Sequence, residues 1–419
     1  MSAAATRRFW TAVHRYLGLA VMGFLLIAAV TGCLLCADGP IDEALNPDLF
    51  RTAASGPALS PIEAVDRLER ARPELVVTQF PLRAKPGRTI KAAVTARDAK
   101  TALGFDQIFL DPHDAHVVGM RQSGPGLDRR HIVEAVFLLH YTLLAGRWGR
   151  WLMGVAALGW LIGNGVGFYL TLPGTGPFWR RWRPAWAIDI RARLARLMLD
   201  LHRASGLWLL IGLTALAFTS VAMNFFDEAF TPAVSAISPA RPSPFDRPPG
   251  PRSGDGGAIG FERALAGASQ AARERNLHWT PAVETYLPDR GLYGVMFTPS
   301  GYEAYRGLGP VTYYLDERSG RLVYADDPYH DSTGRKFSRA LYPLHSGEVA
   351  GPIGRAVVFL LGLATAEMCV TGFYVWWKKR RSRRATDRAG RVAGFDAVQA
   401  GRKAGMVDAV GIEPTTPPV

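Results

Sequence analysis

The stretch AVVFLLGLATAEMCVTGFYVWW occupies residues 356–377 and contains one charged side chain, Glu367. At about 1.5 Å per residue, a helix of this length crosses the hydrocarbon core of a membrane, which is about 30 Å thick. Three further runs of similar length carry no charge at all: 17–37, 151–172 and 204–226. The sequence therefore predicts four membrane-spanning helices and excludes a wholly soluble protein.

The charges indicate how these spans are oriented. The 419-residue chain has 49 basic and 36 acidic side chains, and the basic excess lies in residues 1–16, in the link 173–201 and directly after Trp377. Loops that flank spans and stay in the cytoplasm are rich in Lys and Arg. We therefore expect both termini in the cytoplasm and the segments 38–130 and 227–344 outside, and no nucleic acid partner.

The chain repeats itself. Shifts of 188 and 205 residues align the spans and bring four pairs into register: His14 with His202, Thr31 with Thr219, His140 with His345, and Gly167 with Gly372. Each half reads as span, outside segment, span, in the same orientation, and such repeats are related by an axis along the membrane normal. The expected fold class is membrane α-helical: a four-helix transmembrane bundle of two parallel repeats, with two outside α+β domains.

Apolar periodicity outlines these outside domains. The first is expected to have a helix over 61–72 and strands over 75–80, 89–96 and 107–110; the second a helix over 261–275, a strand over 293–298 and a hairpin over 312–324. The expected organisation is 1–37 N-terminus and first span, 38–130 first outside domain, 131–172 interfacial helix and second span, 173–201 basic loop, 202–226 third span, 227–344 second outside domain, 345–378 fourth span and 379–419 disordered basic tail.

Four histidines occupy matched places in the repeat. His14 and His202 lie at the cytoplasmic starts of spans one and three, and His140 and His345 at the outer approaches to spans two and four. The repeat axis puts each pair at one depth, where two imidazoles from opposite helices suit axial ligation of a haem iron. Four glycines are expected to leave room for the macrocycle: Gly18, Gly206, Gly146 and Gly351. One histidine at a membrane interface is ordinary, but four at matched positions favour two haem sites over a tetrahedral metal site, which needs more ligands.

Three features near these histidines allow alternatives. The residues 132–145 are predicted to form a separate helix at the outer face, and His131 is the alternative ligand to His140. Four arginines follow the repeat at depths where haem propionates would lie, although arginines at span ends also snorkel to water: Arg15, Arg203, Arg150 and Arg355. Glu367, matched by Ile162 in the other half, is either a proton relay or a protonated acid bonded to a neighbouring helix.

Several motifs carry a resemblance to a known family. Trp10, His14-Arg15 and Gly18 enter the first span and Thr31-Gly32 leaves it, while LHSGE precedes the fourth span at 344–348 and TGFYVWWK ends it at 371–378. Over residues 6–384 the chain resembles the PepSY-associated transmembrane helix family. The outside segments are similar to PepSY domains, whose hairpin turn of the D-x-x-x-G type occurs here at 316–320. The sequence departs from this pattern at Ala115 and Ser220, which replace glycines.

The resemblance implies a function. Members of the family include bacterial inner-membrane proteins similar to ferric-siderophore reductases, with b haems whose ligands map onto His14, His202, His140 and His345. The implied protein carries two b haems, takes electrons from a cytoplasmic flavoprotein or a quinol, and reduces a ferric chelate outside. No glycine-rich nucleotide or flavin fingerprint is present, and no catalytic residue is assigned.

Two other functions stay open on the sequence. One is a membrane-anchored PepSY module that regulates a peptidase or acts as a sensor without haem. The other is a siderophore permease. An inhibitor has no need of paired histidines at both depths, and a permease needs a polar path, for which the spans offer little beyond Asn164, Asn224 and Glu367.

Overall fold

The computed structural model describes residues 2–53, 56–239, 242–246, 248, 250 and 257–408. The chain divides into two compact units. One contains residues 1–19, 166–208 and the chain from Glu367 onward, and the other contains residues 20–165 and 209–366. Segments from both halves of the sequence repeat enter each unit, so neither repeat folds as a unit of its own.

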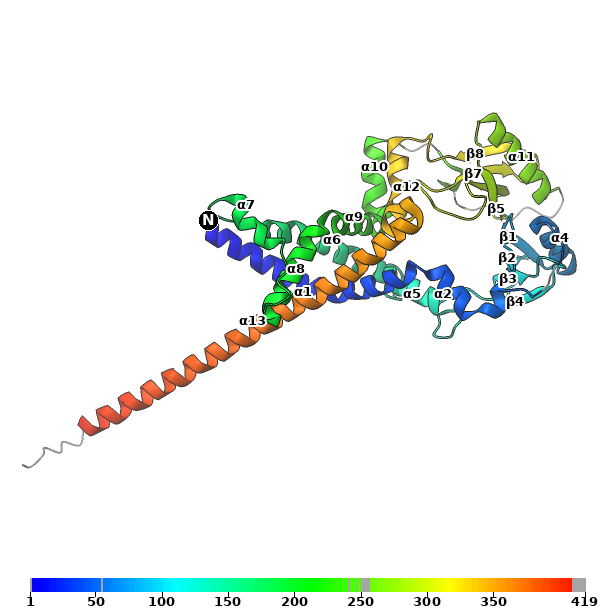
Figure 1. Cartoon of the computed structure of the whole chain (residues 1–419). Helices are drawn as coiled ribbons and strands as arrows, with labels where there is room; N and C mark the ends of the chain where they lie inside the picture. Colours follow the sequence, from blue (N-terminus) through cyan, green and yellow to red (C-terminus); the bar gives the residue numbers. More distant parts are fainter. Residues whose placement is uncertain are drawn as a thin grey trace, which may run out of the picture. The chain divides into compact units, whose positions relative to one another are not determined.

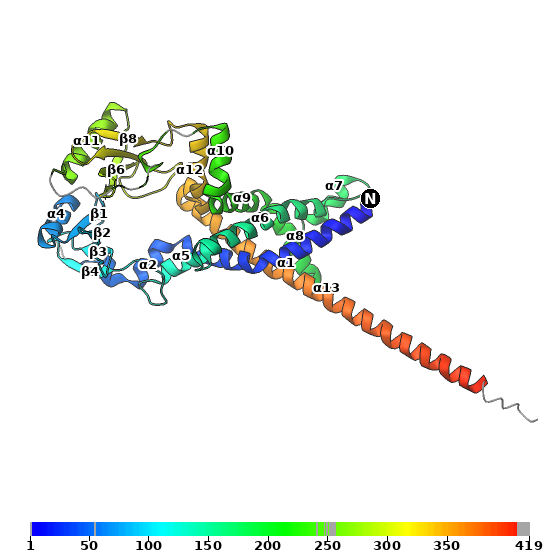
Figure 2. The ribbon, with the colours of Figure 1, turned by 180° about the vertical axis from the view of Figure 1, so that it is seen from behind.

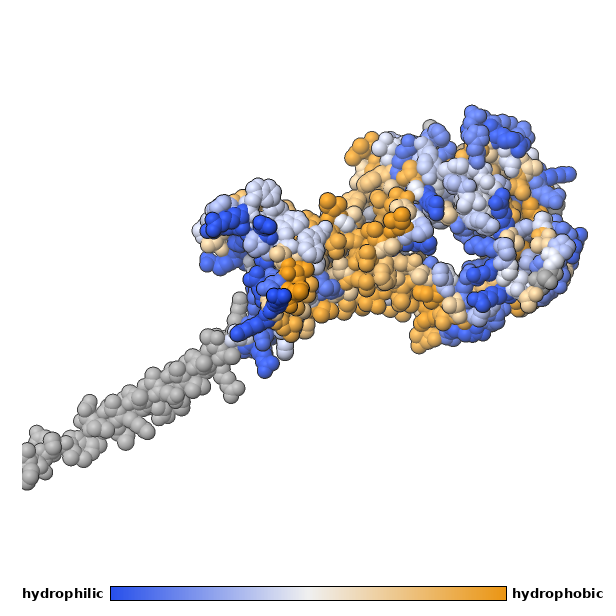
Figure 3. Space-filling model, in the orientation of Figure 1, coloured by the Kyte–Doolittle hydropathy of each residue, from blue (hydrophilic) through white to orange (hydrophobic). Residues whose placement is uncertain are grey.

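Long apolar helices make the chain a multi-pass membrane protein. Three helices in the described part of the chain are long and apolar enough to cross a membrane: α1 (Ala3–Leu35), α6 (Gly146–Thr171) and the portion Glu348–Ser382 that includes the start of α13 (Gly351–Asp408). Hydrophobic residues gather over the helices of the second unit, whereas hydrophilic residues cover its sheet (Figure 3). These helices coincide with three of the four runs expected from the sequence.

The fourth expected run, 204–226, is not one straight helix. Helix α8 (Leu194–Trp208) begins in the basic link and ends within the run, and α9 (Leu210–Asn224) continues it after a break at Leu209. The two helices amount to a span only if a bent pair is counted as one. Gly206 and Gly212 flank the break, and each glycine lowers helix stability by about 1 kcal/mol relative to alanine.

A short helix precedes a long one in each half. Helix α5 (Ile132–Thr142) leads into α6 through Leu143 and Leu144, both with positive φ, and α12 (Thr333–Ser346) leads into α13 through Gly347, with φ 83°. The separate helix expected over 132–145 is confirmed. Both short helices end with a histidine in the last turn, so the two turns hold equivalent histidines beside a long apolar helix.

The segments 38–130 and 227–344 share one antiparallel sheet of eight strands. The first contributes β1 (Leu75–Pro81), β2 (Ile90–Ala96), β3 (Gln107–Leu110) and β4 (Val117–Arg121). The second contributes β5 (Thr280–Leu287), β6 (Leu292–Thr298), β7 (Val311–Asp316) and β8 (Leu322–Asp326). The order β4-β3-β2-β1-β5-β6-β7-β8 reads the same from both ends once matched strands are equated. The six strands expected from the sequence are confirmed, and β4 and β5 are additions to them.

The sheet joins the two domains through their first strands. Strand β1 pairs with β5, with Phe80 opposite Glu284 and Gln79 opposite Thr285. The shift of 205 residues equates Gln79 with Glu284, so the pairing is symmetric about a local two-fold axis. Each domain thereby covers the edge strand of the other, which removes an edge open to aggregation.

Two amphipathic helices pack on this sheet (Figures 1 and 2). Helix α4 (Pro61–Ala71) begins with a capping Ser60, whose Oγ accepts a hydrogen bond from the amide of Glu63, and α11 (Phe261–Glu274) is its counterpart. Their apolar faces join alternate strand residues in the core, where Val65, Phe80 and Val295 are almost fully buried. This burial is the main force that holds the helices on the sheet.

The remaining elements are short, and the last helix is longer than expected. The short elements are α2 (Asp38–Leu45), α3 (Pro47–Phe50), α7 (Phe178–Trp182), α10 (Thr231–Ile237), the 3-10 turns η1 (Arg183–Ala185), η3 (Pro244–Asp246) and η4 (Glu348–Ala350), and the π-helical turn η2 (Phe226–Phe230). Helix α13 continues to Asp408, where we expected disorder from Arg384 onward. Alanine and arginine are strong helix formers, so a helix here needs no apolar stripe. Residues 409–419 lie outside the described chain.

Candidate functional site

The structure brings His140 and His345 together in the second unit. His140 lies in the last turn of α5 and His345 in the last turn of α12, and their ring centres are 6.1 Å apart with an angle of 60° between the planes. The two residues are 205 positions apart in the sequence, and each is partly buried. The repeat therefore predicted this pair correctly.

A threonine hydroxyl contacts each of these two rings. Thr31 Oγ1 on α1 lies 3.0 Å from Nδ1 of His140, and Thr219 Oγ1 on α9 lies 3.0 Å from Nδ1 of His345. Each hydroxyl donates its own hydrogen to a carbonyl one turn earlier in its helix, at Ile27 or Ala215. The hydroxyl oxygen is then left to accept a hydrogen bond from Nδ1–H, which leaves the lone pair of Nε2 available to a metal.

His14 and His202 form a second pair, in the first unit. His14 lies on α1 and His202 on α8, with ring centres 6.3 Å apart and an interplanar angle of 68°. His202 Nδ1 lies 3.1 Å from the carbonyl oxygen of Met368 and 3.2 Å from Oγ1 of Thr371, both on α13. A carbonyl can only accept, so Nδ1 of His202 carries the hydrogen and its Nε2 is the unprotonated nitrogen.

Glycines bring helix backbones against three of the four rings. A Cβ placed on Gly32, Gly167 or Gly372 would lie 3.0–3.1 Å from Cε1 of His140, His14 or His202, respectively. Any larger residue at these positions would push the imidazole away. Sequence reasoning noted these glycines but missed their contact with the rings, and it missed the contacts that Thr31, Thr219 and Thr371 make with the rings. The available signal was the Thr-Gly dipeptide that occurs in two spans, at 31–32 and at 371–372.

The four glycines expected beside the histidines behave differently. A Cβ on Gly18 or Gly146 would have nothing within 4 Å, but both glycines lie exposed on the surface of the chain. A Cβ on Gly206 would meet Met368, and one on Gly351 would meet Arg306. The room for a macrocycle that the sequence suggested beside the histidines therefore stays a prediction.

The spacing of each pair suits one metal ion between two imidazoles. Metal–nitrogen bonds of about 2.0 Å, and about 1.1 Å from each nitrogen to its ring centre, place ring centres about 6.2 Å apart. The pairs measure 6.1 Å and 6.3 Å. Among the described residues, the group of three or more close ligand side chains is Asp111, Asp114 and His116, far along the chain from either pair. Two imidazoles without a third ligand fit axial ligation of a haem iron better than a closed tetrahedral site.

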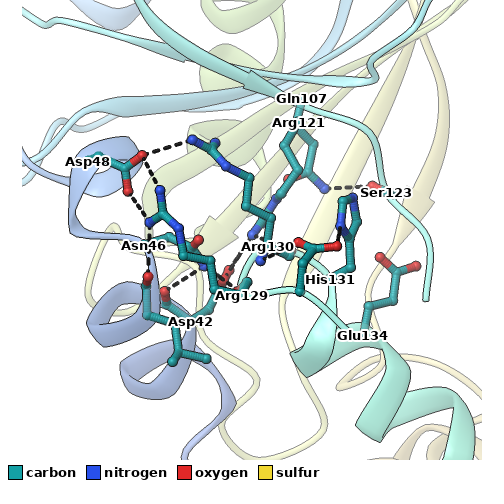
Figure 4. A network of polar contacts seen from close by, with 12 residues as sticks. Asp42, Asn46, Asp48, Gln107, Arg121, Ser123, Arg129, Arg130, His131 and Glu134 are labelled. Atoms are coloured by element: carbon teal, nitrogen blue, oxygen red, sulfur yellow. Dashed lines mark hydrogen bonds and ion pairs between the residues drawn. The ribbon is translucent and has the colours of Figure 1, made fainter. Parts of the chain in front are cut away.

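His131, the alternative to His140, is used elsewhere. Its Nδ1 lies 2.6 Å from the carboxylate of Asp128 and its Nε2 lies 3.0 Å from the carbonyl oxygen of Gln122 (Figure 4). The hydrogen bond from His131 lowers the pKa of the Asp128 carboxyl below its usual range. With both ring nitrogens engaged, His131 anchors the start of α5 and leaves the ligand position to His140.

A polar network around Arg121 fixes the same end of α5 (Figure 4). Arg121, at the end of β4, pairs with Asp42 of α2 at 2.8 Å, donates to Gln107 at 2.9 Å and contacts the carbonyl oxygen of Arg130. The side chains of the pair are only 8% and 16% exposed. The buried pair ties the last strand of the first domain to α2, and the hydrogen bond to Arg130 ties the same strand to the segment that leads into α5 and His140.

The four arginines expected near haem propionates have other partners in three cases. Their contacts are Arg203 with Asp200 and the carbonyl oxygen of Pro184, Arg150 with Glu228 and the carbonyl oxygen of Asn224, Arg355 with Glu348, and Arg15 over the ring of Tyr16. An ion pair lowers the net positive charge that a propionate would meet. Arg15 forms no ion pair with a carboxylate in the described part of the chain, so it is the strongest of the four for that role.

Glu367 lies on α13 one turn before Thr371, near the hydroxyls of Thr371 and Ser205. Thr371 in turn contacts Nδ1 of His202, so the carboxyl lies one residue away from the His14 and His202 pair. Both readings of Glu367 from the sequence, a proton relay and a carboxylic acid bonded to a neighbour, are compatible with this position.

Comparison with known proteins adds one finding. The model of a single protein family, described as the PepSY-associated TM region, matches residues 11–379, which include all four paired histidines. A search of curated proteins finds no match to the chain.

Proposed function

The chain belongs to the PepSY-associated TM family, and from this premise we propose that it is an inner-membrane electron-transfer protein with two b haems. It takes electrons on the cytoplasmic side and reduces a ferric siderophore, or another ferric chelate, on the outer side. Both termini lie in the cytoplasm, and the spans form a four-helix bundle of two parallel repeats. The observation that carries the proposal is the pair of histidine pairs, each with ring centres about 6 Å apart.

Each pair would hold one haem by its axial positions: His14 with His202, and His140 with His345. A bound haem supplies one-electron transfer at its iron. Two such sites at opposite ends of the spans provide the two stations that a path across a membrane requires. The positions of the histidines at the cytoplasmic starts and outer approaches of the spans support this order.

The chain's own residues prepare the imidazoles. Thr31 and Thr219 accept the Nδ1 hydrogens of His140 and His345, and the carbonyl oxygen of Met368 accepts that of His202. Such hydrogen bonds fix the tautomer and the ring plane, and they raise the basicity of the nitrogen that binds the metal. Gly32, Gly167 and Gly372 keep the neighbouring helices close, which excludes water from the imidazoles.

The reaction transfers one electron for each ferric ion. A cytoplasmic flavoprotein or a quinol is oxidised, and the ferric chelate outside is reduced to ferrous ion and free chelator. Ferrous ion has a lower charge than ferric ion and binds hard oxygen ligands less tightly, so reduction releases the iron. The PepSY-like sheet is the outside structure available to receive the chelate.

The test is a reduced-minus-oxidised absorption spectrum of the detergent-purified chain, with pyridine haemochrome quantitation. The wild type is expected to show low-spin b-type bands and about two haems per chain. His14→Ala and His345→Ala should each lose about one. The matched control is His330→Ala, whose ring is exposed and pairs with Asp327, and which should keep both haems.

Two outcomes would count against the proposal. A colourless wild type after expression with ample haem would leave a membrane-anchored PepSY module as the better reading. Loss of the same single haem in both histidine variants would show that the pairs do not form separate sites. Reduction of a ferric siderophore by the reduced protein, followed by trapping of ferrous ion, then tests the acceptor.

A further inference from the structure

A basic pocket lies in the first unit, away from the histidines' ring nitrogens. Its volume is about 700 Å³, within the range of about 300–1,000 Å³ that small-molecule sites have. The end of α6, the following loop, α7 and one side chain each from α1 and α8 line it. Its charged lining is Arg7, Arg180, Arg181 and Arg203.

No acidic side chain lines this pocket. The carboxylate that pairs with one of these arginines is that of Asp200, which is 1% exposed and contacts both Arg196 and Arg203. Arg203 also has a buried Nε atom without a hydrogen-bond partner among the described residues. Four guanidinium groups with at most one carboxylate near them leave a strongly positive cavity, which favours an anion.

Hydrogen bonds and close packing hold the walls of the pocket in place. Arg7 on α1 donates to the carbonyl oxygens of Leu170 and Leu172 at the end of α6, at 2.6 Å and 2.8 Å. Arg181 donates to Oγ1 of Thr175, and it packs so closely on Gly176 that a Cβ there would lie 2.7 Å from its Nε. Gly176 has φ 77°, a conformation that favours glycine. The positions of these guanidinium groups are therefore set before any ligand binds.

The surface beside the pocket is aromatic. Helix α7 carries Phe178, Trp179 and Trp182 next to Arg180 and Arg181, and Trp179 is 74% exposed. Tryptophan and arginine together at the end of an apolar helix are typical of the level of lipid headgroups. A free anion would use the arginines alone, whereas a lipid would use the arginines for its phosphate and the aromatic surface for its chains.

We propose that this pocket binds the headgroup phosphate of an anionic phospholipid. The guanidinium groups of Arg180 and Arg181 bind the phosphate oxygens, and the exposed ring of Trp179 covers the start of the acyl chains. Basic pockets at helix ends on the cytoplasmic side are a recognised lipid site. The proposal is independent of whether the histidine pairs bind haem, because none of its residues is a paired histidine.

The experiment is native mass spectrometry of the full chain in a nonionic detergent. The probes are phosphatidylglycerol, phosphatidylcholine with the same acyl chains, and inorganic phosphate. Wild type is expected to bind phosphatidylglycerol at least about tenfold more tightly than phosphatidylcholine. The double variant Arg180→Gln with Arg181→Gln should lose about 10- to 30-fold of that affinity, since each arginine near anionic lipid contributes about fivefold.

A matched control removes the same charge from the same loop outside the pocket: Arg191→Gln with Arg193→Gln should bind phosphatidylglycerol as wild type does. Arg180→Lys keeps the charge and should bind phosphatidylglycerol nearly as well as wild type. This variant controls for a loss of binding that is caused by misfolding. Equal losses in the two double variants, equal affinity for the two lipids, or displacement of the lipid by equimolar phosphate would overturn the proposal. So would a loss of haem with unchanged lipid binding, which would assign the pocket to propionates.

Discussion

The two histidine pairs are built differently although the same repeat produces both. In the pair His140 and His345, the repeat-matched hydroxyls of Thr31 and Thr219 contact the two Nδ1 atoms at the same distance, 3.0 Å. In the pair His14 and His202, Thr371 contacts His202, but the residue matched to it is Val166, which has no hydroxyl. The hydroxyl contacts of one pair are therefore matched across the repeat, whereas the contact of Thr371 with His202 has no hydroxyl at its matched position.

The difference shows that the repeat preserves the paired histidines more strictly than it preserves the residues that contact their rings. A second-layer hydrogen bond tunes a metal-bound imidazole, so equal support predicts two equivalent ligands and unequal support predicts two unequal ones. If the pairs hold haems as proposed, an electron path would benefit from different potentials at the two. The difference between Val166 and Thr371, with Glu367 one turn from Thr371, would then be a means to separate those potentials.

The outside domains show the same contrast in their charges. Arg121 at the end of β4 pairs with Asp42, and at the matched position at the end of β8, Asp326 pairs with Arg335 and Arg339 of α12. The sign of the buried charge is reversed between the halves. The second pair ties the last strand of its domain to α12, which carries His345, whereas in the first half a hydrogen bond from Arg121 to the carbonyl oxygen of Arg130 reaches the segment before α5.

Among changes to these ion pairs, the larger expected loss of stability comes from breaking the more buried pair. Asp42→Ala leaves the guanidinium of Arg121 buried without its carboxylate, and removal of one partner of a buried pair costs about 3–5 kcal/mol. Asp326→Ala should cost less, because Arg335 and Arg339 are 27% and 26% exposed and can reach water. Hydrogen exchange of the strand peptides in the full chain measures both. Equal losses would show that burial does not separate the two pairs.

A second comparison concerns matched residues at the centre of the sheet. Glu284 on β5 is fully buried, its carboxylate oxygens have no hydrogen-bond partner among the described residues, and its counterpart on β1 is Gln79. Burial, together with the nearby charge of Asp66, raises the pKa of Glu284 to about 9. The folded chain therefore keeps a proton that the unfolded chain releases near pH 4.5.

The sign of the pH dependence follows from that proton. The favourable contribution is complete below about pH 4.5 and is lost as the pH rises toward 9, at about 1.4 kcal/mol for each pH unit. Glu284→Gln, which copies Gln79, removes this slope. Relative to the variant, wild type should lose sheet stability between pH 5 and 9 in hydrogen-exchange experiments. A pH-independent difference between the two proteins would refute the assignment.

The supporting threonines should have smaller and equal effects. Thr31→Val and Thr219→Val each remove one hydroxyl from the same pair at nearly constant volume, and loss of such support lowers metal affinity about 10- to 100-fold. Titration of the purified apoprotein with haem measures this. Thr365→Val is the control, since its buried hydroxyl contacts only the carbonyl oxygen of Leu361. A strong loss of haem affinity in one variant alone would show that Thr31 and Thr219 do not support His140 and His345 equally.

The smallest effect concerns the two hairpin turns. Gly320 and Ala115 occupy matched positions and both have φ 67°, which glycine adopts readily and alanine does not. Ala115→Gly should therefore stabilise the first hairpin by about 1 kcal/mol and Gly320→Ala should destabilise the second by a similar amount. Thermal unfolding at neutral pH measures the pair. A destabilising Ala115→Gly would mean that the buried methyl group outweighs the backbone strain.

Local patterns were sufficient for much of this architecture. Apolar runs identified the helices long enough to cross a membrane, alternation identified six of the eight strands, and the repeat identified the two histidine pairs, because each of these signals is carried by neighbouring residues or by a constant shift. The break at Leu209 was missed, because Gly206 and Gly212 beside it are no clearer a signal than the glycines inside α6, which is one unbroken helix. The extension of α13 to Asp408 was not predicted, because the sequence there has no apolar stripe.

Other features arise from contacts that no local pattern encodes. Strands β1 and β5 join two domains into one sheet because each offers an edge to the other, and 205 residues separate their matched positions. Thr31 reaches His140 across 109 residues and Thr219 reaches His345 across 126. Arg150, which suggested a propionate contact, pairs with Glu228, 78 residues further along the chain. Periodicity and repetition in the sequence set which residues face inward, and the folded chain sets which of them meet, because hydrogen bonds and ion pairs depend on distance in space.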